Sequence, residues 1–153
     1  MALYDDSLRL LDQRFKAWPK PETFKTPQKG WVFAIRKALG MTQEQLGRRI
    51  NVSKSWIKDI EKNELNGSLT LNTLEKVANA LNCQLVYALI PKEPLTQMVQ
   101  DQARKKAKTL LIQTQHTMAL EDQTPLPDEQ AVQLEKLVNK LLDDKRSRLW
   151  DEE

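Results

Sequence analysis

Four polar side chains are grouped in one short stretch of the sequence, away from the apolar face of the helix expected there. Their types match the groups that base edges present in the major groove of a duplex. Lysine donates to guanine O6 and N7, serine can donate or accept a hydrogen bond, and aspartate accepts from the cytosine amino group. An α-helix fits that groove, so one helix face can hold several such contacts together. The group consists of Lys54, Ser55, Lys58 and Asp59.

Two short helices joined by a tight turn are expected to position these side chains. Leu46 and Ile50 are four residues apart in the first pattern, and Ile57 and Ile60 are three apart in the second. Each helix therefore has one apolar stripe. The connection is Asn51–Val52, where asparagine tolerates a left-handed backbone and valine can fill the space between the helices.

Each of these helices begins at a residue with a suitable capping side chain. Thr42 can cap the first, with Glu44 and Gln45 in its first turn, and Ser53 can cap the second. Two short helices, a polar turn and a second helix with an outward polar face form a helix-turn-helix. An ordinary pair of packed helices is the alternative, and the agreement of caps, a small residue and stripes favours the helix-turn-helix.

The segments TQEQLGRR and VSKSWIKDIE resemble the helix-turn-helix of Cro/cI-type repressors. The shared features are a glutamine at the start of the first helix, the small Gly47 where the helices cross, a hydrophobic turn residue and then Ser53. The resemblance implies that the N-terminal residues of the second helix contact bases, and that Gln43 holds a phosphate. The indole of Trp56 either contacts sugar or a thymine methyl, or packs against the neighbouring helix, which is the favoured interpretation.

One such unit has limited specificity, because each good base contact contributes roughly 1–3 kcal/mol of discrimination. A homodimer that contacts two half-sites roughly 34 Å apart overcomes this limit. The sequence therefore predicts a palindromic operator in double-stranded DNA.

Charge is distributed unevenly along the chain, although the formal net charge is only +3. Residues 29–62 contain eight basic and three acidic residues, whereas residues 121–153 contain five basic and ten acidic ones. The basic segment suits phosphate, and the contrast indicates two surfaces with different partners.

Several classes of site are not expected. Cys83 and His116 are the single cysteine and histidine, so neither an intrachain disulfide nor a cysteine-rich metal site is predicted. No triad, phosphate loop or metal cluster indicates an enzyme, and no cofactor or metal is expected. No apolar run has transmembrane length and no signal peptide is evident, so we expect a bacterial cytoplasmic protein without membrane contact.

The predicted fold is mainly α. It comprises a Cro/cI repressor-like helix-turn-helix domain, a short strand and C-terminal helices. Residues 83–90 (CQLVYALI) are rich in β-formers and bounded by Asn82 and Pro91, so we expect a strand that pairs with its own copy; the alternative is a last buried helical turn. The expected domains are a helical arm and linker (1–29), a DNA-binding domain (30–82), the dimerising strand (83–92) and a helical region (93–153).

Over nearly its whole length the chain resembles the mobile mystery protein A family. The resemblance rests on the segments GWVFAIRKALGMTQEQLGRR, LNGSLTLNTLEKVANALNCQLVYALIPK, HTMALEDQ and RLWDE. Members sit beside a protein with a Fic domain, an enzyme class that transfers AMP from ATP to target hydroxyls. The resemblance implies an antitoxin that inhibits such a toxin, binds it through the C-terminal helices and represses its own operon. The alternative is a stand-alone repressor whose C-terminal helices serve dimerisation or signal sensing.

Fic enzymes are inhibited by a helix with the motif Ser/Thr-x-x-x-Glu-Gly/Asn, whose glutamate pairs with an active-site arginine. Among the glutamates of this chain, Glu121 has a matching residue four positions earlier, Thr117, on the same helix face. The next residue is Asp122, where the motif has Gly or Asn. Thr117 and Glu121 are therefore the toxin-inhibiting residues that the resemblance implies; otherwise they are polar residues at a helix end.

Overall fold

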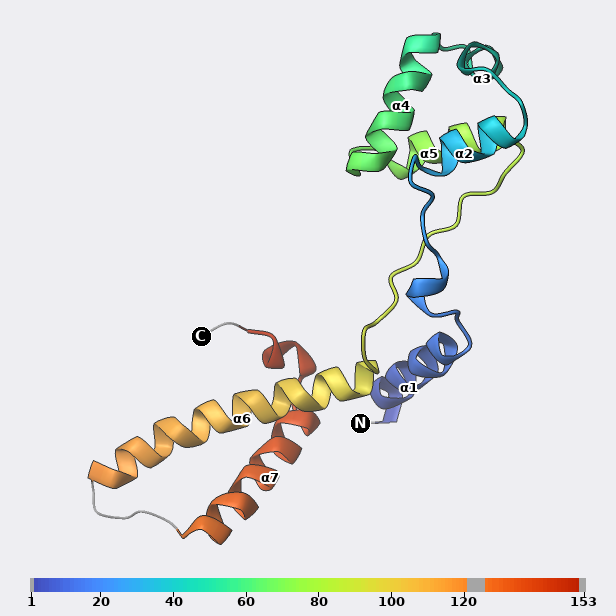
Figure 1. Ribbon diagram of the computed structural model, residues 1–153. Helices are drawn as coiled ribbons and strands as arrows, with labels where there is room; N and C mark the ends of the chain where they lie inside the picture. Colours follow the sequence, from blue (N-terminus) through green and yellow to red (C-terminus); the bar gives the residue numbers. More distant parts are fainter. Residues whose placement is uncertain (1, 121–125, 152–153) are drawn as a thin grey trace. The chain divides into compact units, whose positions relative to one another are not determined.

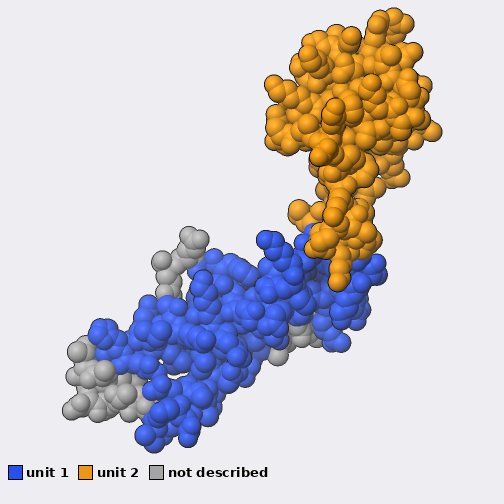
Figure 2. Space-filling view, in the orientation of Figure 1, with its two compact units in different colours: residues 1–18, 90–153 blue, residues 19–89 orange. Residues whose placement is uncertain are grey.

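The computed structural model describes residues 2–120 and 126–151, which belong to two compact units. The first unit contains residues up to 18 and from 90 onward, and the second contains residues 19–89 (Figures 1 and 2). The chain is mainly helical, as predicted, and no strand occurs in the described residues. Across the same residues, no helix has both the length and the apolarity to span a membrane.

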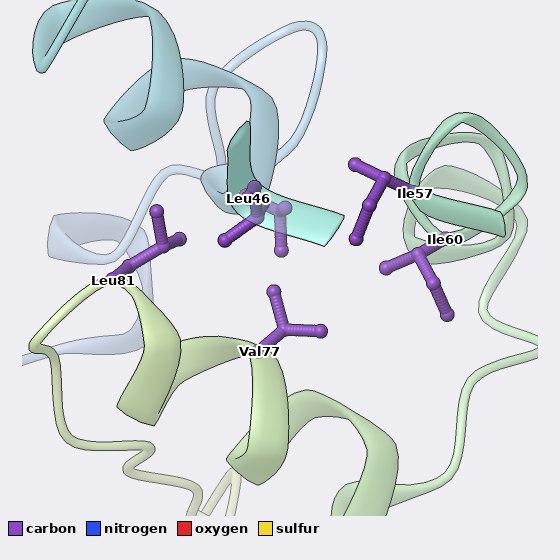
Figure 3. Packing of buried hydrophobic residues seen from close by; sticks show 6 residues of the cluster. Leu46, Ile57, Ile60, Val77 and Leu81 are labelled. Carbon is purple, nitrogen blue, oxygen red and sulfur yellow. The ribbon is translucent and has the colours of Figure 1, made fainter. Parts of the chain in front are cut away.

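The unit of residues 19–89 is a small bundle of helices. It contains a 3-10 turn and four α-helices: η1 (Pro21–Thr23), α2 (Trp31–Ala38), α3 (Gln43–Arg49), α4 (Lys54–Asn66) and α5 (Leu71–Ala80). Side chains from α3, α4 and the α5 region point toward one another in its core (Figure 3). The buried members of this core are Val32, Leu46, Ile57, Ile60, Val77 and Leu81. Of the two expected stripes, Leu46, Ile57 and Ile60 are buried in this core, and Ile50 packs against it.

Local sequence explains where α3 and α4 begin. The Thr42 hydroxyl accepts from the N–H of Gln45, whose side chain accepts from the N–H of Thr42, so the two residues form a capping box. The Ser53 hydroxyl accepts from the N–H of Trp56 at the start of α4. Asn51 in the turn between the helices has φ +56°, the left-handed geometry expected there.

The other unit is built on two long helices, α6 (Leu95–Leu120) and α7 (Pro127–Asp143), together with α1 (Ala2–Lys16) and the turn η2 (Arg146–Leu149). Its buried core consists of Ala103, Ala107, Val138 and Leu149. The two alanines are four residues apart on α6 and leave room for the Leu149 side chain, which is 1% exposed. Gln102 Nε2 donates to the Leu149 carbonyl at 2.7 Å, so the C-terminal turn is held by both packing and hydrogen bonding.

The N-terminal helix is tied to α6 by a cap that comes from far away in the sequence. The Asp12 carboxylate accepts from the N–H groups of Leu95 (2.7 Å) and Thr96 (3.1 Å) and from the Thr96 hydroxyl (2.8 Å). A negative charge is favourable at a helix N-terminus, where N–H groups lack intrahelical partners. Partial burial acts to raise the pKa of Asp12, but these hydrogen bonds and the nearby Lys16 together lower it below the usual range.

The strand expected at residues 83–90 is not found in the single chain. The segment forms neither a strand nor a further helical turn. Val86, Tyr87 and Leu89 are 76%, 70% and 90% exposed, respectively. A strand needs a hydrogen-bonding partner, and none of the described residues supplies one, so intermolecular pairing stays a prediction.

Candidate nucleic-acid interface

The outward face of α4 holds the four polar side chains that the sequence singled out. Lys54, Ser55, Lys58 and Asp59 are all exposed, whereas Ile57 and Ile60 on the opposite side are buried. None of the four forms a side-chain hydrogen bond or an ion pair with another described residue. Their donors and acceptors are therefore free to contact a ligand.

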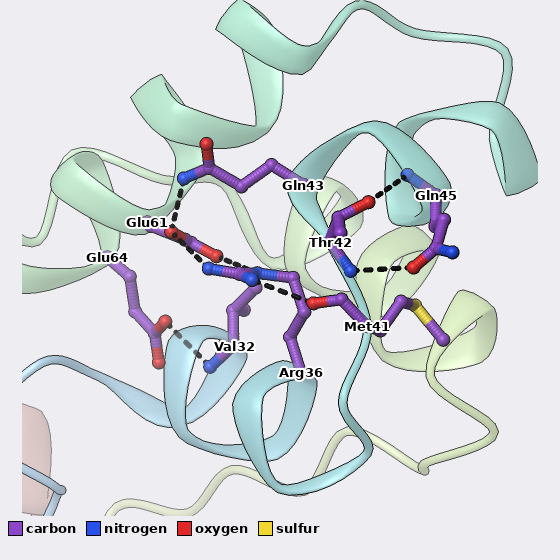
Figure 4. Close-up of polar contacts among 8 residues, drawn as sticks. All are labelled: Val32, Arg36, Met41, Thr42, Gln43, Gln45, Glu61 and Glu64. Atoms are coloured by element: carbon purple, nitrogen blue, oxygen red, sulfur yellow. Dashed lines mark hydrogen bonds and ion pairs between the residues drawn. The ribbon is translucent and has the colours of Figure 1, made fainter.

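A buried ion pair fixes α4 against α2 (Figure 4). Arg36 Nε lies 2.5 Å from Glu61 Oε1, and Arg36 Nη2 lies 3.2 Å from Oε2. A third nitrogen, Nη1, donates to the Met41 carbonyl at 2.8 Å, just before α3 begins. The two side chains are only 5% and 10% exposed, so each charge depends on the other for compensation. This network joins α2, α4 and the chain that leads into α3.

A second carboxylate on α4 caps the start of α2. Glu64 accepts from the N–H groups of Trp31 (2.7 Å) and Val32 (3.0 Å). Gly30 precedes them with φ +84°, and a Cβ there would lie 2.7 Å from Glu64 Oε2. Glycine therefore provides both the positive φ and the space that this cap requires.

The crossing of α3 and α4 also depends on a small residue. A Cβ on Gly47 would lie 2.6 Å from the carbonyl oxygen of Val52 in the connecting turn. The N–H of Val52 in turn donates to the Gly47 carbonyl at 2.9 Å. The position of α4 is thus set by backbone contacts at its entry as well as by its buried side.

Gln43, for which a phosphate contact is expected, is the first residue of α3 and is half-buried. Its Nε2 donates to Glu61 Oε2 at 2.9 Å (Figure 4). A side-chain amide has two N–H donors, so one remains for a phosphate oxygen while the other holds the side chain in place. The ion pair between Arg36 and Glu61 therefore also positions this side chain.

Other residues of the helix-turn-helix that could lie near DNA have distinct environments. Ser53 is used as the N-cap of α4. Trp56 is half-buried and packs against the core, which agrees with the packing interpretation rather than with a fully exposed indole. Arg48 pairs with Glu44 at 2.6 Å on the surface, and Arg49 donates to the Ala80 carbonyl at 2.9 Å.

Sequence analysis missed one residue of this face and the network behind it. Lys62 is exposed one helical turn after Lys58, and the four-residue spacing was the available signal. Arg36 and Glu61 belong to the core side of their helices, and no local pattern indicates that two charged residues so far apart in sequence are buried together.

The proposed toxin-inhibiting residues are placed only in part. Thr117 is exposed near the end of α6, and its hydroxyl donates to the Gln113 carbonyl at 3.2 Å. Glu121 lies outside the described residues. No group of three or more His, Cys, Asp or Glu residues suited to a metal ion is found in the described part of the chain.

Comparisons with known proteins agree with this geometry. Residues 32–87 match the helix-turn-helix family model, so this part of the chain is a helix-turn-helix domain of the Cro/cI type. Over 77 residues the chain is 43% identical to an immunity repressor protein of Bacillus phage phi105, and the match covers 50% of each protein. The chain thus spans about half the length of that relative. No solved structure gives a significant match.

Proposed function

We propose that the protein is a transcriptional repressor that binds an inverted-repeat DNA operator as a dimer, with α4 in the major groove. The observation that carries the proposal is the outward face of α4, where exposed lysine, serine and aspartate side chains have no hydrogen-bond or ion-pair partner among the residues that the structure describes. The helix-turn-helix match and the similarity to a phage immunity repressor support the same function. A DNA-binding protein of this kind acts in the bacterial cytoplasm.

The four side chains suggest which bases are contacted. In the proposed complex Lys54 and Lys58 donate to guanine O6 and N7, and Asp59 accepts from a cytosine amino group. Ser55 tolerates more than one base because its hydroxyl both donates and accepts. The remaining N–H of the Gln43 amide holds a phosphate, which fixes the orientation of the domain without reading sequence.

Selection from random-sequence duplex DNA at physiological salt tests the proposal. We expect enrichment of an inverted repeat whose half-sites lie one helical turn apart, or a multiple of it. Absence of any enriched repeat would refute the proposal. On the selected site, Lys58→Ala should weaken binding and relax the preference for guanine at one position in each half-site.

Lys76→Ala is a matched control for that variant. Lys76 is an exposed lysine on α5, within the same unit but outside the proposed interface. Lys76→Ala changes the net charge by the same amount as Lys58→Ala, so comparing the two variants separates a specific base contact from a general electrostatic effect. Equal losses of affinity in the two variants would contradict the assignment of Lys58.

The antitoxin role implied by the resemblance to mobile mystery protein A is a separate prediction. The comparisons support the DNA-binding domain and give no support to a Fic-domain partner, so the repressor role has the stronger basis. Co-expression with a neighbouring Fic-domain protein would test the antitoxin role by complex formation. In such a complex, Glu121→Gly should release AMP transfer.

A further inference from the structure

We infer that residues 83–90 of two copies pair with each other as an antiparallel two-stranded ribbon that joins the two DNA-binding units. The inference deepens the proposed function, on which its purpose rests, but the pairing itself can be measured without DNA. The structural basis is the extended segment of chain between α5 and α6, called the thread below (Figure 1).

The backbone of this thread has unused hydrogen-bonding groups. The N–H of Cys83 donates to the Ala78 carbonyl at 2.8 Å. For residues 84–93, no backbone–backbone hydrogen bond is formed within the described chain. Each non-proline residue presents one donor and one acceptor, so an extended segment of this kind is a template for another strand.

Exposed apolar side chains are concentrated in the middle of the same thread. Val86, Tyr87 and Leu89 are each at least 70% exposed, whereas Cys83 and Leu85 are half-buried. Isolated exposed apolar residues are normal, but three large ones within four positions of an unpaired extended backbone are the pattern of an interaction edge. Pairing would remove their apolar surface from water.

The composition of the segment favours a second copy as the partner. No charged residue occurs from Cys83 to Pro91, so two identical segments meet without repulsion between like charges. A two-fold axis at residue 87 places Tyr87 opposite the partner's Tyr87, and Leu85 opposite the partner's Leu89. Pairs of aromatic residues are favourable across strands, and both tyrosine and valine favour the extended conformation. The contact is isologous, so it closes at a dimer.

The dimensions predict a weak and reversible dimer. Eight extended residues span about 26 Å, and the antiparallel pair forms about eight backbone hydrogen bonds. Such a ribbon covers less than the roughly 800 Å² per partner of a standard stable interface. DNA with two half-sites therefore strengthens the dimer, because binding at one half-site raises the effective concentration of the second copy.

Sedimentation velocity of the full chain over a range of concentrations tests the inference. Val86→Lys is expected to raise the dimer dissociation constant about a hundredfold, since each dimer loses two buried valines and gains two charges. Val132→Lys is the matched control, because Val132 is also exposed but lies on α7. Circular dichroism should show unchanged helix content in both variants.

The single cysteine reports the strand direction. In the antiparallel ribbon the two Cys83 residues lie at opposite ends, about 27 Å apart, so a spin label on each should give a distance of that order. Parallel pairing would bring them to about 5 Å and allow a disulfide to form on oxidation. A disulfide-linked dimer, or a dimer unaffected by Val86→Lys, overturns the inference.

Two further outcomes separate this inference from the proposed function. A wild-type chain that dimerises through residues 83–90 but selects no DNA repeat contradicts the repressor function and supports the pairing. A wild-type chain that selects an inverted repeat while staying monomeric in solution and binding each half-site independently contradicts the pairing and leaves the DNA-binding function standing.

Discussion

Replacing Arg36 by methionine tests whether the buried ion pair holds α4 in place. The substitution keeps a flexible, unbranched side chain, although a shorter one, and removes the charge and three hydrogen bonds, two to Glu61 and one to the Met41 carbonyl. Among the described residues, the Glu61 carboxylate then keeps a single hydrogen bond, from the Gln43 amide at 2.9 Å. A buried carboxylate that has lost its cation has neither water nor a counter-charge to stabilise it, which costs free energy.

The expected loss of stability is large for a single residue. Removing one partner of a buried ion pair typically costs about 3–5 kcal/mol, because the remaining charge is uncompensated. Arg36 and Glu61 are 5% and 10% exposed, so solvent cannot replace the missing partner. Arg48 and Glu44 form a contrasting pair that is 75% and 60% exposed, and Arg48→Ala should cost less than about 1 kcal/mol.

Hydrogen exchange read by mass spectrometry is the suitable assay, because the two units need not unfold together. Protection of the α2 and α4 amides should fall in Arg36→Met and stay near the wild-type value in Arg48→Ala. Protection in α6 and α7 serves as an internal reference.

The double variant Arg36→Met/Glu61→Met provides the decisive comparison. It should recover most of the loss, because it replaces the ion pair by apolar packing without leaving an isolated charge. The reasoning fails if Arg36→Met exchanges like Arg48→Ala, or if the double variant is as unstable as the single one.

Three further predictions concern packing and pH. Leu149→Ala should destabilise the unit of α6 and α7 by about 2–5 kcal/mol because it empties a fully buried site, whereas Trp150→Ala, at an exposed neighbour, should change thermal unfolding little. Gly47→Val should destabilise the helix-turn-helix by about 1–3 kcal/mol, since even a Cβ would lie 2.6 Å from the Val52 carbonyl oxygen. An unchanged denaturant midpoint would contradict this, because it would mean that the turn can shift to make room for the side chain. The pKa of Asp12 is lowered in the folded chain, so the stability that its ionised carboxylate contributes is present above the usual value of 3.8 and is lost as pH falls through the lower folded pKa. Acid unfolding of wild type should therefore show an additional loss of stability below that value, and Asp12→Asn should lack it.

Local patterns were sufficient to predict the DNA-binding domain. Each of its signals depends only on residues close by in the sequence. These signals are the apolar stripes of α3 and α4, the caps at Thr42 and Ser53, and the left-handed residue Asn51. Such features follow from helix periodicity and from the unpaired N–H groups of helix ends. They explain why the outward face of α4 could be identified before the structure.

Long-range polar contacts could not be predicted in this way. Asp12 caps a helix that begins 83 residues later, and Arg36 meets Glu61 across 25 residues. In the sequence each carboxylate resembles an ordinary surface residue. Its environment depends on a distant segment, and local periodicity does not predict where that segment lies. The strand expected at residues 83–90 raises a related difficulty, since its expected partner belongs to a second molecule.

The separation between the two sides of α4 determines how its variants should be interpreted. The four outward side chains that are proposed to contact bases form no hydrogen bonds with other described residues, so their substitution should change DNA affinity and leave the unfolding free energy nearly unchanged. The inward polar residues Glu61 and Glu64 hold α2 and the start of α3, so their substitution should reduce stability first and DNA affinity only as a consequence. Gln43 is the exception, because its amide bonds to Glu61 and retains a second donor for phosphate. Gln43→Ala should therefore lower stability slightly and affinity for all DNA sequences alike. A loss confined to one operator sequence would instead assign Gln43 to base contact and contradict its proposed phosphate role.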